Sequence, residues 1–436
     1  MNRWLLNMML AGSVLPLSAG LHAQVKTASP APADTRLMAA MKAKPAVKAA
    51  LAALEAEHDQ WVDNIVTLTQ IPAPPFKEEV RAKAYADMFR AAGLADVEID
   101  ETGNVLGLMR GTGKSGGKLV VVSAHLDTVF PEGTNVTVRR EGTKLHAPGI
   151  GDDVSGLATQ LSLIKALASA KIKAPMDILF VGDVGEEGLG DLRGMKQLFL
   201  KGKYKDRIAS FFSIDDGSTD GLITGGVGSK RYKLTFKGPG GHSFGAFGLV
   251  NPMTAMSQAI VNIYKIPTPK SPKTTYSASV VGGGSSVNAI PREVWLQLDM
   301  RSESAAELAK LEQAVLAQVD AGVASENAAR STKDGAISVD KTLIGDRPAG
   351  ATSPDSSLVR QTAAAYASEG VTARLSFSST DANVPMNLGI PAITIPRAAT
   401  GGRGHSVDEW IDVSPEPSLK VKRMDLLAIL AAAGYR

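Results

Sequence analysis

The chain has 436 residues, a length that suits one large domain or two to three ordinary ones. Its 47 Lys and Arg nearly balance its 44 Asp and Glu, and the resulting charge of +3 argues against a nucleic-acid partner or an anionic membrane surface. The 44% of hydrophobic and 21% of charged residues are typical of a folded globular protein. The chain contains no cysteine, which excludes disulfides, thiolate catalysis and Cys-based metal sites, so any metal ion must be bound by His, Asp and Glu.

The amino-terminal residues 1–24 have the layout of a secretory signal peptide. Arg3 precedes an apolar run from Trp4 to Leu17, and small residues follow up to Ala23. The run is too short, and too interrupted by a glycine and a proline, for a comfortable membrane span. We therefore expect cleavage after Ala23 and a periplasmic or secreted protein with no stable membrane span, the alternative being an uncleaved amino-terminal anchor.

The segment after the signal peptide, residues 24–45, is rich in Ala, Pro and Lys and is expected to be a linker that ends in the first turn of a helix. Apolar residues then recur at helical spacing from Ala46 to Leu68, which predicts one amphipathic helix. A second helix is expected from Glu78 to Ala92, ended by Gly93.

The next part of the chain alternates short apolar runs with helical patterns. Runs rich in β-branched residues occupy 118–124, 176–182, 209–214 and 391–396, and helices are expected at 156–170, 354–369 and 416–432. This alternation predicts an α/β domain with a mainly parallel sheet, formed by residues 46–228 and 343–436.

Residues 229–342 follow a different pattern and interrupt that domain. The stretches RYKLTFK and EVWLQLDMR alternate as half-buried strands do, and the whole segment is predicted to run β-α-β-β-α-β. The expected helices are 252–264 and 304–319, and the other expected strands are 276–281 and 336–339. An inserted ferredoxin-like unit of this kind is expected to be a lid or a dimerisation domain.

Acids and histidines cluster where the predicted strands end. His125 and Asp127 follow the first run, Glu186 and Glu187 follow the second, and Asp215 ends the third. Asp152 precedes a helix, and His405 comes shortly after the last strand. In open α/β sheets, ligands bind beyond the carboxyl ends of the strands, so these side chains are expected to meet.

Imidazole and carboxylate ligands suit a divalent ion, with zinc as the first choice and cobalt or manganese as alternatives. Two ions need a bridging carboxylate, and the available ligands suffice for two: His125, Asp152, Glu187, Asp215 and His405. The second glutamate of the pair, Glu186, is then free to act as a general base.

Six segments in this order resemble the M20 family of zinc-dependent peptidases, from about residue 47 to the carboxyl end: AHLDTVFPEG, GIGDDVSGLA, GEEGLGDLRG, SIDDG, GGHSFG and GGRGHS. The family includes tripeptide aminopeptidases, glutamate carboxypeptidases, dipeptidases and N-acyl amino acid deacylases. One departure is that the Lys common after the bridging Asp is replaced here by Asp153, Val154 and Ser155. GDDVSG is also similar to the M28 aminopeptidases, which lack the lid.

The resemblance implies a role for each matching residue. Asp152 would bridge two zinc ions, with His125 and Asp215 completing one ion and Glu187 and His405 the other. Glu186 would be the general base that activates a metal-bridging water. Asp127 would orient His125.

Three residues of the lid segment are further candidates. His242 matches the family histidine that stabilises the oxyanion, often from the partner subunit, which implies a homodimer through the lid. Asn288 matches a position near the substrate. Arg301 ends an alternating strand and would bind a substrate carboxylate.

The substrate class depends on one ligand. In the family, Asp at the position of Asp215 is mainly found in aminopeptidases and dipeptidases, whereas Glu is mainly found in carboxypeptidases and deacylases. We therefore expect an exported di-zinc hydrolase that cleaves amide bonds of short peptides with a free amino end. The alternatives are an N-acyl amino acid deacylase or carboxypeptidase and, outside catalysis, an inactive periplasmic binding protein.

Overall fold

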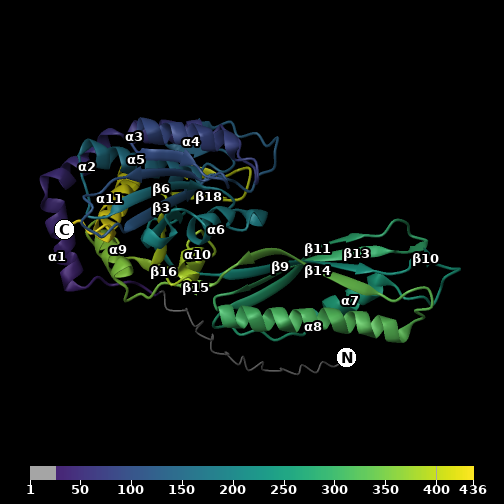
Figure 1. Ribbon diagram of the computed structural model, residues 1–436. Coiled ribbons are helices and arrows are strands. Elements are labelled where there is room, and N and C mark those ends of the chain that lie inside the picture. The colour runs from purple at the N-terminus through teal and green to yellow at the C-terminus, as the bar shows by residue number, and fades with distance from the viewer. Residues whose placement is uncertain (1–25, 399) are drawn as a thin grey trace, which may run out of the picture.

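The computed structural model describes residues 26–398 and 400–436, which form an α/β domain and an elongated lid that projects from it (Figure 1). The predicted signal peptide, residues 1–23, lies outside the described residues. Within the described part of the chain, no helix combines the length and the apolar character needed to cross a membrane.

The α/β domain is built on a nine-stranded sheet in the order β1-β2-β6-β3-β7-β17-β8-β15, with β16 paired to β8. The central strands β6, β3, β7 and β17 are parallel to one another, and β16 is parallel to β8. The pairs β1-β2, β2-β6, β17-β8 and β15-β8 are antiparallel. This confirms the mainly parallel sheet. The strands are β1 (Ala95–Ile99), β2 (Val105–Met109), β3 (Leu119–His125), β6 (Asp177–Asp183), β7 (Ile208–Asp216), β8 (Gly221–Gly226), β15 (Gly350–Ala351), β16 (Arg374–Ser378) and β17 (Ala392–Pro396).

Helices cover both faces of this sheet, which is why its central strands are apolar throughout. Val120 and Val122 of β3 join the core formed with α5 and α11, whereas Leu119 and Val121 join the opposite core with α6 and α10. The helices of the domain are α1 (Pro32–Ala43), α2 (Pro45–Ala56), α3 (His58–Thr69), α4 (Glu79–Ala91), α5 (Val154–Ser169), α6 (Arg193–Leu200), α9 (Ser357–Ala367), α10 (Asn383–Asn387) and α11 (Pro415–Ala432).

The amino-terminal region differs from expectation in two ways. Most of the expected linker is the helix α1, whose Met38 and Met41 are fully buried in the core of the domain. The single helix expected from Ala46 to Leu68 is two helices, α2 and α3, separated at Glu57. Both helices pack on α5, so tertiary packing overrides the continuous helical periodicity.

The lid has the predicted β-α-β-β-α-β order and an antiparallel sheet in the order β11-β13-β9-β14. Its elements are β9 (Gly228–Lys237), α7 (Pro252–Ile263), β11 (Thr274–Gly283), β13 (Glu293–Ser302), α8 (Ala305–Ala329) and β14 (Ser338–Arg347). The helix α8 and the strand β14 are both longer than the sequence pattern indicated, and β14 leads directly back into the α/β domain.

Two small sheets complete the described chain. At the end of the lid far from the α/β domain, β10 (Gly241–His242) pairs with β12 (Ala289–Ile290) (Figure 1). In the α/β domain, β18 (Thr400–Gly402), β19 (Trp410–Asp412), β5 (Lys144–His146) and β4 (Arg139–Glu141) form a four-stranded sheet. This second sheet joins the segment that carries His405 to the loop that leads to Asp152.

Candidate active site

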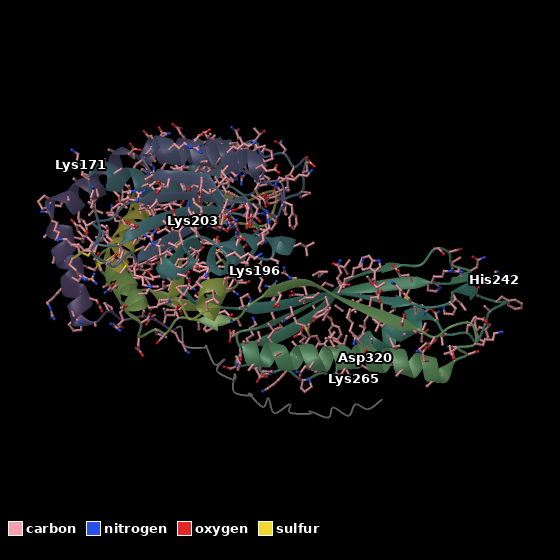
Figure 2. The ribbon with its side chains drawn as sticks, in the orientation of Figure 1. Lys171, Lys196, Lys203, His242, Lys265 and Asp320 are labelled. Atoms are coloured by element: carbon pink, nitrogen blue, oxygen red, sulfur yellow. The ribbon has the colours of Figure 1, made fainter. Side chains whose placement is uncertain are left out.

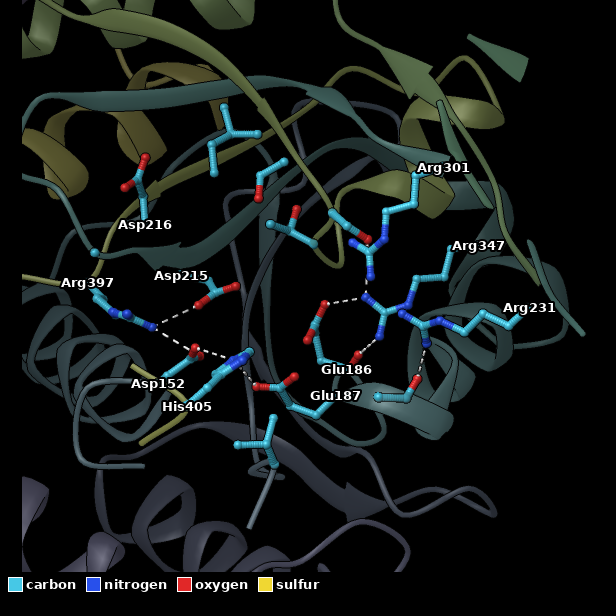
Figure 3. A pocket seen from close by; sticks show the side chains of 17 residues that line it. Asp152, Glu186, Glu187, Asp215, Asp216, Arg231, Arg301, Arg347, Arg397 and His405 are labelled. Carbon is cyan, nitrogen blue, oxygen red and sulfur yellow. Dashed lines mark hydrogen bonds and ion pairs between the residues drawn. The ribbon is translucent and has the colours of Figure 1, made fainter. Parts of the chain in front are cut away.

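The predicted metal ligands meet at the carboxyl ends of the central parallel strands. His125 ends β3, Asp215 lies at the end of β7, and Glu187 lies in the loop after β6. Asp152 reaches the same edge from the turn before α5, and His405 from the loop after β18 (Figure 3). Their convergence follows from the parallel order of β6, β3 and β7.

Asp152 lies between the two histidines, with one carboxylate oxygen toward each. Its Oδ1 is 3.1 Å from Nε2 of His125, and its Oδ2 is 3.2 Å from Nε2 of His405. Asp215 Oδ1 is 3.9 Å from Nε2 of His125, and Glu187 Oε1 is 3.0 Å from Nε2 of His405. These distances define two half-sites that share Asp152: the His125 half-site with Asp215, and the His405 half-site with Glu187.

The charges of the two half-sites fit a cation. Burial alone would raise the pKa of Asp152, but the charge of Arg397 and the hydrogen bonds of both histidines hold this pKa well below its usual range. Hydrogen bonds to Asp152 and Glu187 raise the pKa of His405 to about 10. The positive charge of the protonated His405 thus balances part of the negative charge of Asp152 and Glu187. A divalent ion bound to these residues would supply that positive charge instead.

The donor set fits two divalent ions. Ligand atoms of Asp152, Glu187 and His405 lie within 4.8 Å of one another, as do those of His125, Asp153 and Asp215. Asp153 is an addition to the predicted ligands. Its Oδ2 accepts a hydrogen bond from the main-chain N–H of His125, which leaves only its Oδ1 without a partner in the described chain.

Asp127 lies beside His125, and its carboxylate makes its hydrogen bonds with the loop that follows β6. Its carboxylate is 3.7 Å from Nδ1 of His125, and Nδ1 instead faces the main-chain oxygen of Asp127 at 3.0 Å. The carboxylate accepts hydrogen bonds from the main-chain N–H groups of Gly185, Glu186 and Glu187. Asp127 thus holds the loop that carries the predicted base and a ligand.

Glu186 is buried beside the half-sites and is paired with Arg347. The Nη1 of Arg347 is 3.0 Å from Oε1 of Glu186, and its Nη2 bonds the main-chain oxygen of the same residue. Burial raises the pKa of Glu186 well above its usual value, although the charge of Arg347 opposes this rise. A raised pKa suits a group that must accept and return a proton near neutral pH.

A pocket of about 450 Å³ opens beside these groups, between the α/β domain and the lid. Arg301, the residue predicted to bind a substrate carboxylate, lines it together with Arg231 and Arg347, and Arg397 lines it from the α/β domain (Figure 3). Asp299 pairs with both Arg231 and Arg301 through Oδ1 and Oδ2, at 3.1 and 2.7 Å. The lid side of the pocket is therefore net positive, which suits an anionic group of a substrate.

His242 and Asn288 do not reach this pocket within their own chain. Figure 2 shows His242 at the far end of the lid. Asn288 lies next to it, because the N–H of the following residue, Ser243, donates to the main-chain oxygen of Asn288. Both are exposed, and neither lines the pocket.

Two residues that the sequence did not single out hold the site together. The carboxylate of Glu409 accepts hydrogen bonds from the main-chain N–H groups of Gly149, Gly151 and Asp152, at 2.8, 3.0 and 2.9 Å. Arg397 pairs with both Asp152 and Asp215. Arg397 directly follows the strand predicted at 391–396, and this position could have marked it as a residue of the site. A search for metal ligands does not consider it, because an arginine does not bind a cation.

Comparison with known proteins agrees with this geometry. Residues 121–428 match the profile of the family described as Peptidase family M20/M25/M40. The chain belongs to this family. It is therefore a metallopeptidase-type hydrolase, as the sequence predicted.

One curated relative and two solved structures extend the comparison. Carboxypeptidase G2 of Pseudomonas sp. (strain RS-16) is 26% identical over 201 residues, which cover 45% of this chain and 47% of that enzyme, so the match spans about half of its length. A tripeptidase of Staphylococcus aureus superposes with a TM-score of 0.70 at 19% identity, covering 86% of this chain and 99% of its own. Aminopeptidase PepT of Bacillus cereus gives 0.68 at 21% identity with the same coverage. These two likenesses confirm the fold, including the inserted lid.

Proposed function

We propose that the protein is a di-zinc enzyme that hydrolyses amide bonds of short peptides with a free amino end, as an aminopeptidase or dipeptidase. The observation that carries this proposal is Asp152, whose two oxygens face two separate histidine half-sites next to a buried glutamate. Asp215 in the His125 half-site and the likeness to a tripeptidase and an aminopeptidase support the substrate class.

In the proposed reaction, Glu186 transfers the proton. Bound zinc would supply Lewis-acid polarisation of the scissile carbonyl and lower the pKa of a water. Glu186 takes the proton of the attacking water and delivers it to the leaving amine. Asp127 keeps Glu186 in place, because its carboxylate binds three successive N–H groups of the same loop.

The lid is proposed to complete the site of a second copy. His242 and Asn288 are both assigned to the substrate by resemblance, yet both lie at the exposed end of their own lid. A homodimer through the lids would deliver this pair to the partner's pocket. His242 would then donate a hydrogen bond to the oxyanion there.

A second candidate is a carboxypeptidase or N-acyl amino acid deacylase. Arg231, Arg301 and Arg347 on the lid side of the pocket favour it, because they suit a substrate carboxylate, and the partial match to carboxypeptidase G2 points the same way. In either case Arg301 is proposed to bind the substrate carboxylate. The inactive binding protein is disfavoured, because the base and all five predicted ligands are present and meet in one site.

Export remains part of the proposal and rests on the sequence of residues 1–23 alone. Its test is the amino-terminal residue of the protein recovered from the periplasm or the medium. A first residue at Gln24 supports cleavage after Ala23, and an intact Met1 contradicts it.

The substrate test is hydrolysis of a small panel by the zinc-loaded mature protein, with and without a chelator. The panel holds free-amino di- and tripeptides, their N-acetylated forms, and N-acyl amino acids. Chelator-sensitive cleavage of the free-amino peptides alone is expected. Cleavage of the N-acyl compounds instead would replace the aminopeptidase by a deacylase, and no turnover with zinc bound would favour a binding protein.

A further inference from the structure

Arg397 places a permanent positive charge inside the metal centre. It directly follows β17, and its side chain is 14% exposed. Its Nη1 is 3.1 Å from Oδ1 of Asp152 and 3.1 Å from Oδ1 of Asp215 (Figure 3). The guanidinium therefore shares both acids of the His125 half-site.

The two oxygens that Arg397 binds are those that a metal ion would need. The same Oδ1 atoms of Asp152 and Asp215 lie nearest Nε2 of His125, at 3.1 and 3.9 Å. In the His405 half-site, Oδ2 of Asp152 and the carboxylate of Glu187 lie next to His405. No Lys or Arg among residues 26–398 and 400–436 forms an ion pair with Glu187.

An incoming ion therefore meets different competing charges in the two half-sites. In the His405 half-site, an incoming ion meets a histidine and a glutamate that form no ion pair with a Lys or Arg of the described chain. An arginine keeps its charge at any ordinary pH. An ion in the His125 half-site must therefore either displace the guanidinium from two carboxylates or remain beside a like charge.

Hydrogen bonds fix the main chain of Arg397, and its side chain also borders a second cavity of about 210 Å³. Its main-chain N–H donates to the oxygen of Asp216 at 3.0 Å, and its own main-chain oxygen accepts from Oγ1 of Thr159 at 3.2 Å. Its Nη2 passes 3.1 Å from the point where a Cβ on Gly217 would lie. The backbone is thus fixed on both sides, and the head group is held close to the chain that follows β7.

We propose that the protein binds two metal ions with unequal affinity, tightly in the His405 half-site and weakly in the His125 half-site, because Arg397 competes for the second ion. With one ion bound, Arg397 takes the place of the other cation and keeps Asp152 and Asp215 in position. This inference rests on the metal centre of the proposed function, but it does not depend on the substrate.

The test is a calorimetric zinc titration of the metal-free full-length chain. The wild type is expected to bind one ion tightly and a second about 100-fold more weakly, as suits competition with a buried ion pair. Arg397→Met should bring the two affinities within about 10-fold of each other. Arg374→Met removes a half-exposed arginine of the same domain, paired with Asp220, and should leave the titration unchanged.

Two ligand variants test which half-site is tight, even if Arg397→Met does not fold. Glu187→Gln should abolish the tight binding event, whereas Asp215→Asn should keep it and lose the weak one. Equal affinities in the wild type, an unchanged ratio in a folded Arg397→Met, or the opposite result from the ligand variants would overturn the inference. If the wild type binds no zinc, the metal centre of the proposed function fails, which is a different outcome.

Discussion

Arg347 binds Glu186 twice, through Nη1 to a carboxylate oxygen 3.0 Å away and through Nη2 to the main-chain oxygen. Arg347 is the last residue of β14, the strand that leads from the lid back into the α/β domain. The proposed base is therefore tied to the strand that joins the lid to the α/β domain, and the charge of Arg347 at the end of this strand opposes the rise in the pKa of Glu186.

The pairing predicts a pH effect for Arg347→Met. Burial raises the pKa of Glu186, and the charge of Arg347 opposes this, so its loss should raise the pKa further. The base must be deprotonated, so activity is lost as the pH falls through this pKa. The acidic limb of the profile of kcat/KM should therefore move to higher pH in Arg347→Met and less in Arg347→Lys. An unmoved limb in both variants would contradict the pairing.

Glu186→Gln tests the base itself. The amide keeps the shape of the side chain but cannot accept the proton, so turnover should fall by about 10²–10⁴-fold. Zinc content should remain that of the wild type, because Glu187 and not Glu186 is the proposed ligand. Glu132→Gln, an exposed glutamate on the surface, serves as the control. Near-normal turnover in Glu186→Gln would exclude the assignment.

Glu409 is expected to act on the metal through the loop of Asp152. Its carboxylate binds three N–H groups of that loop, and a Cβ on Gly151 would lie only 2.6 Å from Oε1, so the fit is close. Glu409→Gln turns an NH2 group toward at least one of these donors and should weaken zinc binding by about 10–100-fold. The matched control is the exposed Glu416→Gln. Unchanged zinc affinity in competition with a chromophoric chelator would show that the loop holds without Glu409.

The placement of His242 predicts complementation between inactive variants. His242→Ala and Glu186→Gln should each be inactive alone. A mixed dimer restores one complete site from the intact Glu186 of one chain and the intact His242 of the other, so random exchange should recover about a quarter of the wild-type activity. A fully active monomer, or no recovery after verified subunit exchange, would remove His242 from the mechanism.

Lys422 predicts a pH-dependent stability remote from the site. It is fully buried on α11, with Nζ 4.4 Å from the centre of the Trp61 ring, and burial lowers its pKa to about 7 while Glu57 opposes the shift. In the unfolded chain the lysine keeps its proton up to about pH 10.4. Below pH 7 the buried lysine is charged in the folded state as well, and the free energy of unfolding is reduced by the full cost of burying that charge. As the pH rises from 7 to about 10.4 this cost disappears and the free energy of unfolding increases.

Lys422→Met should therefore unfold with a larger free energy than the wild type at pH 6, and the difference should shrink toward pH 10. Each unit between the two pKa values is worth about 1.4 kcal/mol. Denaturant unfolding at several pH values measures the difference, with the exposed Lys48→Met as control. A difference that does not change with pH would show that Lys422 keeps its charge in the fold.

Local sequence was sufficient for the central strands of the sheet, for the order of elements in the lid and for the edge of the sheet at which the predicted ligands lie. The runs that became β3, β6, β7 and β17 are apolar because both faces of the sheet are covered, and the polar residues that follow them could therefore be assigned to one edge. The alternation in β9 and β13 reports one buried face in the same way. A strand buried on both faces is visible in the sequence as an apolar run, and the polar residues directly after such a run mark the edge of the sheet where the site lies.

Only the tertiary structure decided which charges meet there. Arg347 lies 161 residues from Glu186, and Glu409 lies 257 residues from Asp152, so no local pattern records either contact. The same holds for the helix α1, whose burial depends on α9 and α11, and for the end of the lid, which points away from its own pocket. Periodicity reports whether a segment is buried, whereas the partner of a buried charge depends on how distant loops are placed by the packing of the whole chain.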